Sequence, residues 1–283
     1  MASDAATLDA RGVLRTGDPR AALEKLKQEV RKAPRDPELR TFLFQLFCIT
    51  GEWDRAINQL SVISEIDKLA MPMVTTYRAA IRCEILRERV FAGTRQPTFF
   101  GEPEPWMSLL MEANRRLAAG AYDHAAELRD QAFEAAPASS GTVDGTGFEW
   151  IADADPRLGP VVEAIVDGKY YWLPVHRLAK LEIDPPEDLR DQVWLPAQLT
   201  FANGGSTVGL LPARYPGTEA AADPALLLGR RTEWVEKAEG WFLGLGQRML
   251  TIGAEEDLPL LDLRSLGIAA PPAAAAEAPA SDG

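Results

Sequence analysis

Three stretches in the first half of the chain repeat one spacing around a glycine. LRTGDPRAALEKL and CITGEWDRAINQL place Gly17 and Gly51 34 residues apart, and LAAGAYDHAAELR repeats the pattern around Gly120. An alanine follows each glycine after five residues, and Pro34 and Pro137 follow two of them after seventeen. Glycine permits a tight turn between antiparallel helices, alanine lets the helices approach closely, and proline ends the second helix. The spacing therefore predicts helical pairs that bury their apolar faces by stacking on neighbours.

The period of these repeats resembles that of the tetratricopeptide repeat (TPR). Two further segments, MVTTYRAAIRCEILRERVFAG and PWMSLLMEANRRLAAG, also have a helical pattern, and the proline-rich loop TRQPTFFGEPEP separates them. We therefore expect residues 1–137 to form a TPR-like α-helical domain.

The composition changes near Ala136. The stretch APASSGTVDGTG is small and polar, so residues 138–147 are predicted to be a linker. In VVEAIVDGKYYWLP, apolar residues alternate on both sides of Asp167-Gly168, which predicts a hairpin with a type I′ turn and one buried face.

A second hairpin is predicted in WLPAQLTFANGGSTVGLLP, and further short strands follow it. Residues 148–268 are therefore expected to form a small antiparallel β-barrel-like domain. The Ala/Pro-rich tail, residues 269–283, is expected to be disordered. The fold class is α+β, with the helical repeats first.

The charge of the chain disfavours two classes of partner. Lys and Arg number 30 and Asp and Glu 42, which gives a net charge of −12 and a pI near 4.8. Such a chain repels phosphate backbones and anionic lipid, so neither nucleic acid nor a membrane is expected as a partner. We find no signal peptide and no run near the about 20 apolar residues that a spanning helix needs. Cys48 and Cys83 are expected to be buried small hydrophobes, which fits a cytoplasmic protein.

Catalytic and metal-binding patterns are scarce. The chain has two histidines, no GxSxG elbow and no phosphate-binding loop. Glu149, Asp153 and Asp155 do not follow the spacing of a calcium loop, and we expect them to form a solvated turn. No catalytic, metal or cofactor site is predicted.

Arginine, aspartate and aromatic residues gather in three loops of the second half. Bidentate Arg–Asp pairs could fasten these loops to the sheet. Alternatively, the loops form a protein-binding surface, because Trp, Tyr and Arg dominate interface hot spots. Both interpretations stay open for Arg190, Asp191, Trp194, Arg214, Tyr215 and Trp234.

Several long motifs occur in a fixed order. They are LRTGDPRAAL, FLFQLFCITGEWDRAINQL, DPRLGPVVEAIVDGKYYWLP, PEDLRDQVWLPAQLTFANGG, LLPARYPG, GRRTEWVE and LGQRMLTIGAEEDLPLLDLRSL. Together they resemble the ImpE/TagJ family, also called SciE-type, from about Leu8 to Ile268, and only the Ala/Pro-rich tail departs from it. The resemblance implies a non-enzymatic, cytoplasmic accessory protein of the bacterial type VI secretion system. It further implies binding to the small subunit of the contractile sheath (TssB-like), with the ClpV-type AAA+ ATPase as a second candidate partner.

A binding mode follows from the helical repeats. Stacked helices would form a concave groove in which a helical segment of the sheath subunit lays its apolar face. Arg40, Phe44 and Tyr77 are the residues that we predict to line this groove.

Two alternatives come from other classes of protein. One is a hydrolase or transferase with a site between the helical and β domains, built from Asp155, Arg190, Asp191 and Arg214. The other is a scaffold that organises oligomers. A homodimer is compatible with both alternatives.

Overall fold

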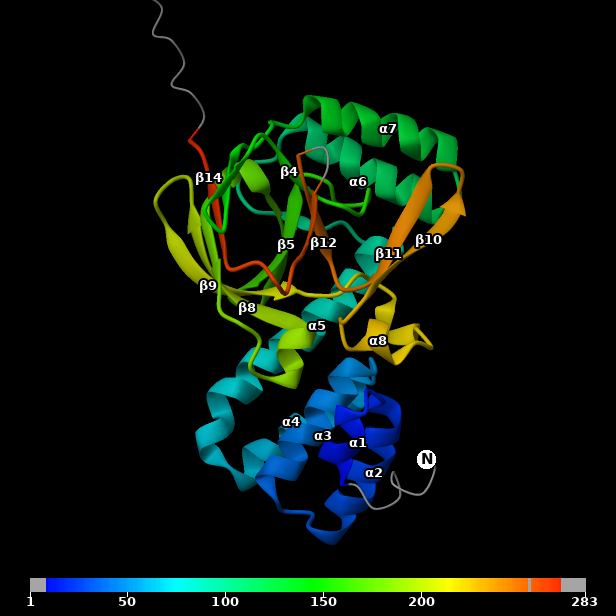
Figure 1. Cartoon of the computed structure of the whole chain (residues 1–283), viewed down its shortest axis with the longest axis vertical. Coiled ribbons are helices and arrows are strands. Elements are labelled where there is room, and N and C mark those ends of the chain that lie inside the picture. Colours follow the sequence, from blue (N-terminus) through cyan, green and yellow to red (C-terminus); the bar gives the residue numbers. More distant parts are fainter. Residues whose placement is uncertain (1–8, 254–255, 271–283) are drawn as a thin grey trace, which may run out of the picture.

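The structure, a computed structural model, describes residues 9–253 and 256–270. Most of the predicted tail lies outside this range. Helices α1 to α4 lie at one end of the molecule and the main sheet at the other, with α5 running from one to the other (Figure 1). No helix within the described ranges is both long and apolar enough to cross a membrane.

The predicted helical pairs around the three glycines are confirmed. Gly17, Gly51 and Gly120 each lie between two helices and have positive φ angles of 96°, 72° and 77°, which glycine tolerates best. Asp18 and Asp36 begin the second and third helices, because their carboxylates accept hydrogen bonds from first-turn N–H groups. The helices are α1 Ala10–Arg15, α2 Pro19–Lys32, α3 Pro37–Ile49, α4 Trp53–Ile66, α5 Met71–Phe91, α6 Pro105–Ala118 and α7 Tyr122–Ala135.

The third helical pair does not continue the stack of the first two. Helices α6 and α7 lie beside the sheet, away from α3 and α4 (Figure 1). Leu117 of α6 and Ala125 of α7 pack with Trp241 of the second half, and the indole Nε1 of Trp241 donates to the carbonyl of Tyr122 at 3.2 Å. A continuous TPR-like superhelix is therefore not confirmed, because the long α5 carries the chain away from the first two pairs.

The main sheet has nine strands in the order β1-β6-β5-β9-β8-β7-β14-β2-β3. The predicted barrel is not closed: β1 and β3 are the two edges, and β1 has only two residues, which pair in parallel with β6. The nine strands are β1 Thr98–Phe99, β2 Gly141–Val143, β3 Thr146–Phe148, β5 Val161–Val166, β6 Lys169–Pro174, β7 Leu178–Ile183, β8 Trp194–Phe201, β9 Ser206–Pro212 and β14 Ser265–Ile268.

The predicted Asp-Gly hairpin is confirmed as β5 and β6. Asp167 and Gly168 have φ of 49° and 71°, as a type I′ turn requires. The prediction of one buried face was wrong, since every residue of β5 is buried. Val161 packs into the core shared with the helices, and Val162 packs into the core of the sheet.

The predicted linker takes part in the sheet. Strands β2 and β3 form a hairpin that begins at Gly141, and β2 pairs with β14. A Cβ on Gly141 would lie 1.9 Å from the carbonyl oxygen of Gly267, so this close pairing requires glycine. The small residues therefore permit tight strand packing here.

Two smaller sheets complete the second half. Strands β4 Ile151–Asp153, β12 Met249–Ile252 and β13 Glu256–Pro259 form one of them. Strands β10 Thr232–Ala238 and β11 Trp241–Gly246 form a separate two-stranded ribbon. The short helix α8, Pro224–Leu227, precedes the ribbon.

Candidate protein-binding groove

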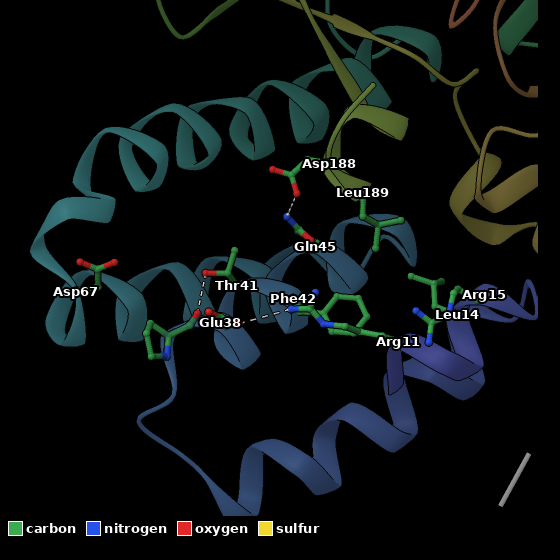
Figure 2. A pocket seen from close by; sticks show the side chains of 11 residues that line it. Arg11, Leu14, Arg15, Glu38, Thr41, Phe42, Gln45, Asp67, Asp188 and Leu189 are labelled. Carbon is green, nitrogen blue, oxygen red and sulfur yellow. Dashed lines mark hydrogen bonds and ion pairs between the residues drawn. The ribbon is translucent and has the colours of Figure 1, made fainter. Parts of the chain in front are cut away.

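A groove opens on the helical end of the molecule, where α1, α3 and one loop of the second half meet (Figure 2). Its volume is about 530 Å³. The wall opposite α1 comes from the 3₁₀ turn η3, Leu189–Gln192, and the residue before it. The lining residues are Arg11, Leu14, Arg15, Pro37, Glu38, Thr41, Phe42, Gln45, Asp67, Asp188 and Leu189.

The floor of the groove is apolar. Leu14 and Leu189 are half-buried, and Phe42 is buried at its base. The guanidinium of Arg11 lies over the Phe42 ring, 5.4 Å from its centroid, and 3.9 Å from the carboxylate of Glu38. A cation over an aromatic face is attracted by the ring quadrupole, so Arg11 is held across the floor.

Hydrogen bonds fix the η3 wall. Gln45 donates from Nε2 to the Asp188 carboxylate at 2.8 Å, which joins α3 to the second half of the chain. The Arg190 guanidinium lies 2.5 Å from the same carboxylate. The buried Asp191 carboxylate accepts the backbone N–H groups of Glu187 and Asp188, at 3.0 and 2.8 Å. The wall is therefore preorganised rather than loose.

The rim of the groove carries both signs of charge. Arg11 and Arg15 come from α1, whereas Glu38, Asp67 and Asp188 are acidic. Figure 2 shows Asp67 and Arg15 at opposite ends of the groove. An apolar floor with a mixed polar rim suits the apolar face of an amphipathic helix.

The three residues predicted to line the groove do not line it. The Arg40 side chain donates to the carbonyl of Pro34 at 2.9 Å and to Gln59 at 2.8 Å. Phe44 and Tyr77 are buried, with ring centroids 5.7 Å apart. They pack between α3 and α5, because the sheet half covers the helix face that the repeat alone would leave open.

Arg190 and Asp191 belong to η3 itself, and Trp194 begins β8 shortly after it. The guanidinium of Arg190 is 4.8 Å from the Tyr77 ring centroid, and the rings of Tyr77 and Trp194 are 5.8 Å apart. The fully buried indole of Trp194 donates to Glu84 at 2.9 Å. These contacts join η3 and the start of β8 to α5.

Arg214 and Tyr215 also have structural contacts. Arg214 is buried and donates to the carbonyls of Cys48, Ile49 and Leu227, at 3.3, 3.0 and 2.5 Å. Two of these carbonyls belong to the last turn of α3, where C=O groups have no i+4 helical partner, although that of Cys48 also accepts the N–H of Gly51. The hydroxyl of Tyr215 lies 3.1 Å from the Asp153 carboxylate. Of the predicted loop residues, Trp234 is exposed, at 37%.

A buried network of ion pairs joins the two halves of the chain. Arg87 of α5 donates from Nε and Nη2 to Glu163 of β5 at 2.7 and 2.8 Å, and lies 3.3 Å from Glu84. Burial acts to raise the pKa of Glu163, but Arg87, Arg248 and the Tyr170 hydroxyl together outweigh it, so the pKa is lowered overall. Arg248 lies 3.4 Å from the same Glu163 and binds Asp153 at 2.6 Å.

The predicted solvated turn was wrong for two of its three residues, Asp153 and Asp155, which belong to this network, whereas Glu149 is exposed. Asp153 and Asp155 are buried, and burial raises the pKa of Asp153 to about 6 although Arg248 opposes it. Asp155 accepts from Arg157 at 2.6 Å and from the N–H of Gly244 at 2.8 Å. Buried carboxylates need such partners, and the sequence alone does not show which residues provide them.

The structure does not gather the four residues of the enzyme hypothesis into one cleft. Asp155, Arg190, Asp191 and Arg214 are each bonded to different protein groups. No three His, Cys, Asp or Glu side chains lie close enough to hold a metal ion in the part of the chain that the structure describes.

Sequence reasoning missed the residues that line the groove. Glu38, Thr41, Phe42 and Gln45 follow the i, i+3, i+4, i+7 spacing of one helical face. That spacing was available in the sequence. The contribution of Leu189 was not, because Leu189 belongs to a distant part of the sequence and reaches the groove only through the fold.

Comparisons with known proteins define the class of this chain. A family model described as ImpE protein matches residues 145–267. The type VI secretion system accessory component TagJ of Pseudomonas aeruginosa is 50% identical over 254 residues, which cover 90% of this chain and 89% of that protein. A crystal structure of a Vibrio parahaemolyticus protein superimposes with a TM-score of 0.84 at 27% identity, covering 92% of this chain and 97% of that one. This chain belongs to the ImpE/TagJ family.

Proposed function

We propose that this protein is a non-enzymatic, cytoplasmic accessory component of a bacterial type VI secretion system. In this proposal it binds a helical segment of the small contractile-sheath subunit (TssB-like). The family relationship supports a role in a type VI secretion system, since the relative from Pseudomonas aeruginosa is named as an accessory component of that system. The groove between α1, α3 and η3 supports the mode of binding.

The observation that carries the proposal is the match between the groove and a helix. The α3 residues from Glu38 to Gln45 cover about 10 Å along the helix axis, or two turns. A partner helix would place apolar residues at i, i+3, i+4 and i+7 over Phe42, Leu14 and Leu189. Its polar flanks would meet the charged rim.

A ClpV-type AAA+ ATPase is the second proposed partner. A protein that holds the sheath subunit in one place and the ATPase in another raises the effective concentration of the ATPase at the sheath. Such an adaptor needs no catalytic residue of its own. Assembly or disassembly of the sheath would then be modulated by proximity alone.

Calorimetry with the purified small sheath subunit tests the groove. Thr41 is half-buried in the lining of the groove, and Thr41→Arg would place a long cationic side chain in it. We expect binding to weaken at least about tenfold, the range of one lost interface hot spot. Gln28→Arg adds the same side chain at an exposed site of α2 outside the groove and should leave binding unchanged. Equal binding by both variants, with both folded by circular dichroism, would place the site elsewhere.

A further inference from the structure

The β10–β11 ribbon has one strand with an open edge. Among the described residues, β10 pairs with β11 alone, whereas β11 is bonded on both sides. The ribbon stands at the side of the molecule next to α7, with β10 outermost (Figure 1). A free strand edge offers unpaired N–H and C=O groups to another strand.

The backbone direction of this edge follows from two hydrogen bonds of β11. The N–H of Gly244 donates to Asp155 at 2.8 Å, and that of Gly246 donates to Thr218 at 2.8 Å, so both point away from β10. Their register partners, Trp234 and Thr232, are therefore in non-hydrogen-bonded pairs. The N–H and C=O groups of Trp234, and by alternation those of Glu236, point outward from the ribbon.

We propose that β10 pairs antiparallel with β10 of a second copy of this chain, around a two-fold axis at Val235. In this register the outward groups of Trp234 face those of Glu236 in the second copy, and each pair can exchange two hydrogen bonds. Glu233 of each copy then lies opposite Lys237 of the other copy, so the interface contains two such pairs. By alternation from Trp234, Glu233 lies at a non-hydrogen-bonded position, where side chains approach most closely.

The charges of β10 select this register over its neighbours. An axis at Glu233 or at Glu236 would place two glutamates directly opposite each other, which is destabilising. An axis at Trp234 would place Glu233 opposite Val235 and form no ion pair. The β-bulge lies between Glu236 and Ala238, and Lys237 has no register partner in β11. The regular ladder therefore ends at Glu236, and Lys237 is the last residue that the pairing includes.

Partly exposed aromatic side chains give a second reason for self-association. They lie on one face of the ribbon, where the Tyr215 ring of the same chain covers Gly244 and lies 5.6 Å from the Trp234 ring. Trp234 and Phe242 are exposed at 37% and 47%, and both lie on the face that carries Gly244 and Glu236. In the four-stranded sheet of a dimer, the Trp234 rings of the two copies become diagonal neighbours on this face. Exposed aromatic surface is thereby covered, and a dimer would present two grooves at once.

Sedimentation velocity over a range of concentrations tests the pairing. We expect the wild-type protein to show a monomer–dimer equilibrium. Glu233→Lys and Lys237→Glu each create two like-charge pairs, so each should raise the dimer dissociation constant about tenfold, given the size of cross-strand charge effects. Both side chains are exposed, so neither variant should unfold the ribbon.

The decisive experiment is sedimentation of a mixture of the two variants. In a heterodimer, the two lysines of the Glu233→Lys copy would face the two glutamates of the Lys237→Glu copy. Association should therefore return in the mixture, although each variant alone dimerises weakly. A wild-type protein that stays monomeric at all concentrations would overturn the proposal. So would single variants that dimerise as strongly as the wild type, because the interface would then lie away from β10.

Discussion

Replacing Glu163 by glutamine should remove the central negative charge of the buried network while keeping its shape. Glu163 is fully buried and faces two guanidinium groups, those of Arg87 and Arg248. It also accepts a hydrogen bond from the hydroxyl of Tyr170. A glutamine amide occupies the same space but carries no charge, so the substitution tests the ion pairs rather than the packing.

The expected loss follows from the charges that remain. The buried network around Glu163 holds four buried arginines and four buried carboxylates, so it is electrically balanced: Arg87, Arg157, Arg214, Arg248, Glu84, Asp153, Asp155 and Glu163. Glu163→Gln leaves one cation without compensation, and breaking a buried pair from one side costs about 3–5 kcal/mol. With a urea m-value of about 3 kcal/mol/M, the unfolding midpoint should fall by about 1–1.7 M.

Urea unfolding followed by tryptophan fluorescence measures this difference. Glu182→Gln is the matched control, because the Glu182 side chain is 50% exposed and pairs with Lys180 at the surface at 2.7 Å. Exposed pairs contribute little, so the control midpoint should stay within experimental error of the wild type. If the two variants unfold at the same midpoint, the buried pairs do not hold the halves together and the reasoning fails.

Two further predictions concern buried titratable groups. Burial raises the pKa of Tyr77 to about 12, above its unfolded value near 10, so stability is fully present below pH 10 and is lost as pH rises toward 12. Tyr77→Phe should make the loss of stability between about pH 10 and 12 shallower in thermal melts, and an unchanged slope would contradict the assignment. Burial also raises the pKa of Cys83 to about 12 and that of Cys48 well above its usual range. Both thiols should therefore react with Ellman's reagent at about pH 8 only after denaturant is added, and rapid reaction of the native protein would disprove their burial.

Short-range features of the fold were predictable from the sequence. The glycine-centred helical pairs and the turn at Asp167-Gly168 depend on a few neighbouring residues and on the φ angles that these tolerate. In each case the sequence signal and its physical cause lie within one segment.

Features that depend on distant segments were not predictable. Phe44 and Tyr77 are aromatic residues of the kind that line binding grooves. They are buried only because the Trp194 region of the sheet packs over them. Glu163 lies in the apolar run VVEAIV, and its role depends on Arg87 of another element. The segment at Gly141 resembles a linker in composition, yet the carbonyl of Gly267 determines its conformation.

Because Arg214 donates hydrogen bonds to the end of α3, these contacts of α3 form only after Arg214 has been synthesised. Arg214 follows Ile49 by 165 residues, and the core that covers Phe44 and Tyr77 also includes residues of the sheet. At about 5–20 residues per second, a ribosome needs about 8–33 s to make the intervening chain. During that interval the nascent helices expose aromatic surface and carbonyl groups that do not yet have their Arg214 partner, so this protein should depend on chaperones at the ribosome more than a free-standing helical repeat does.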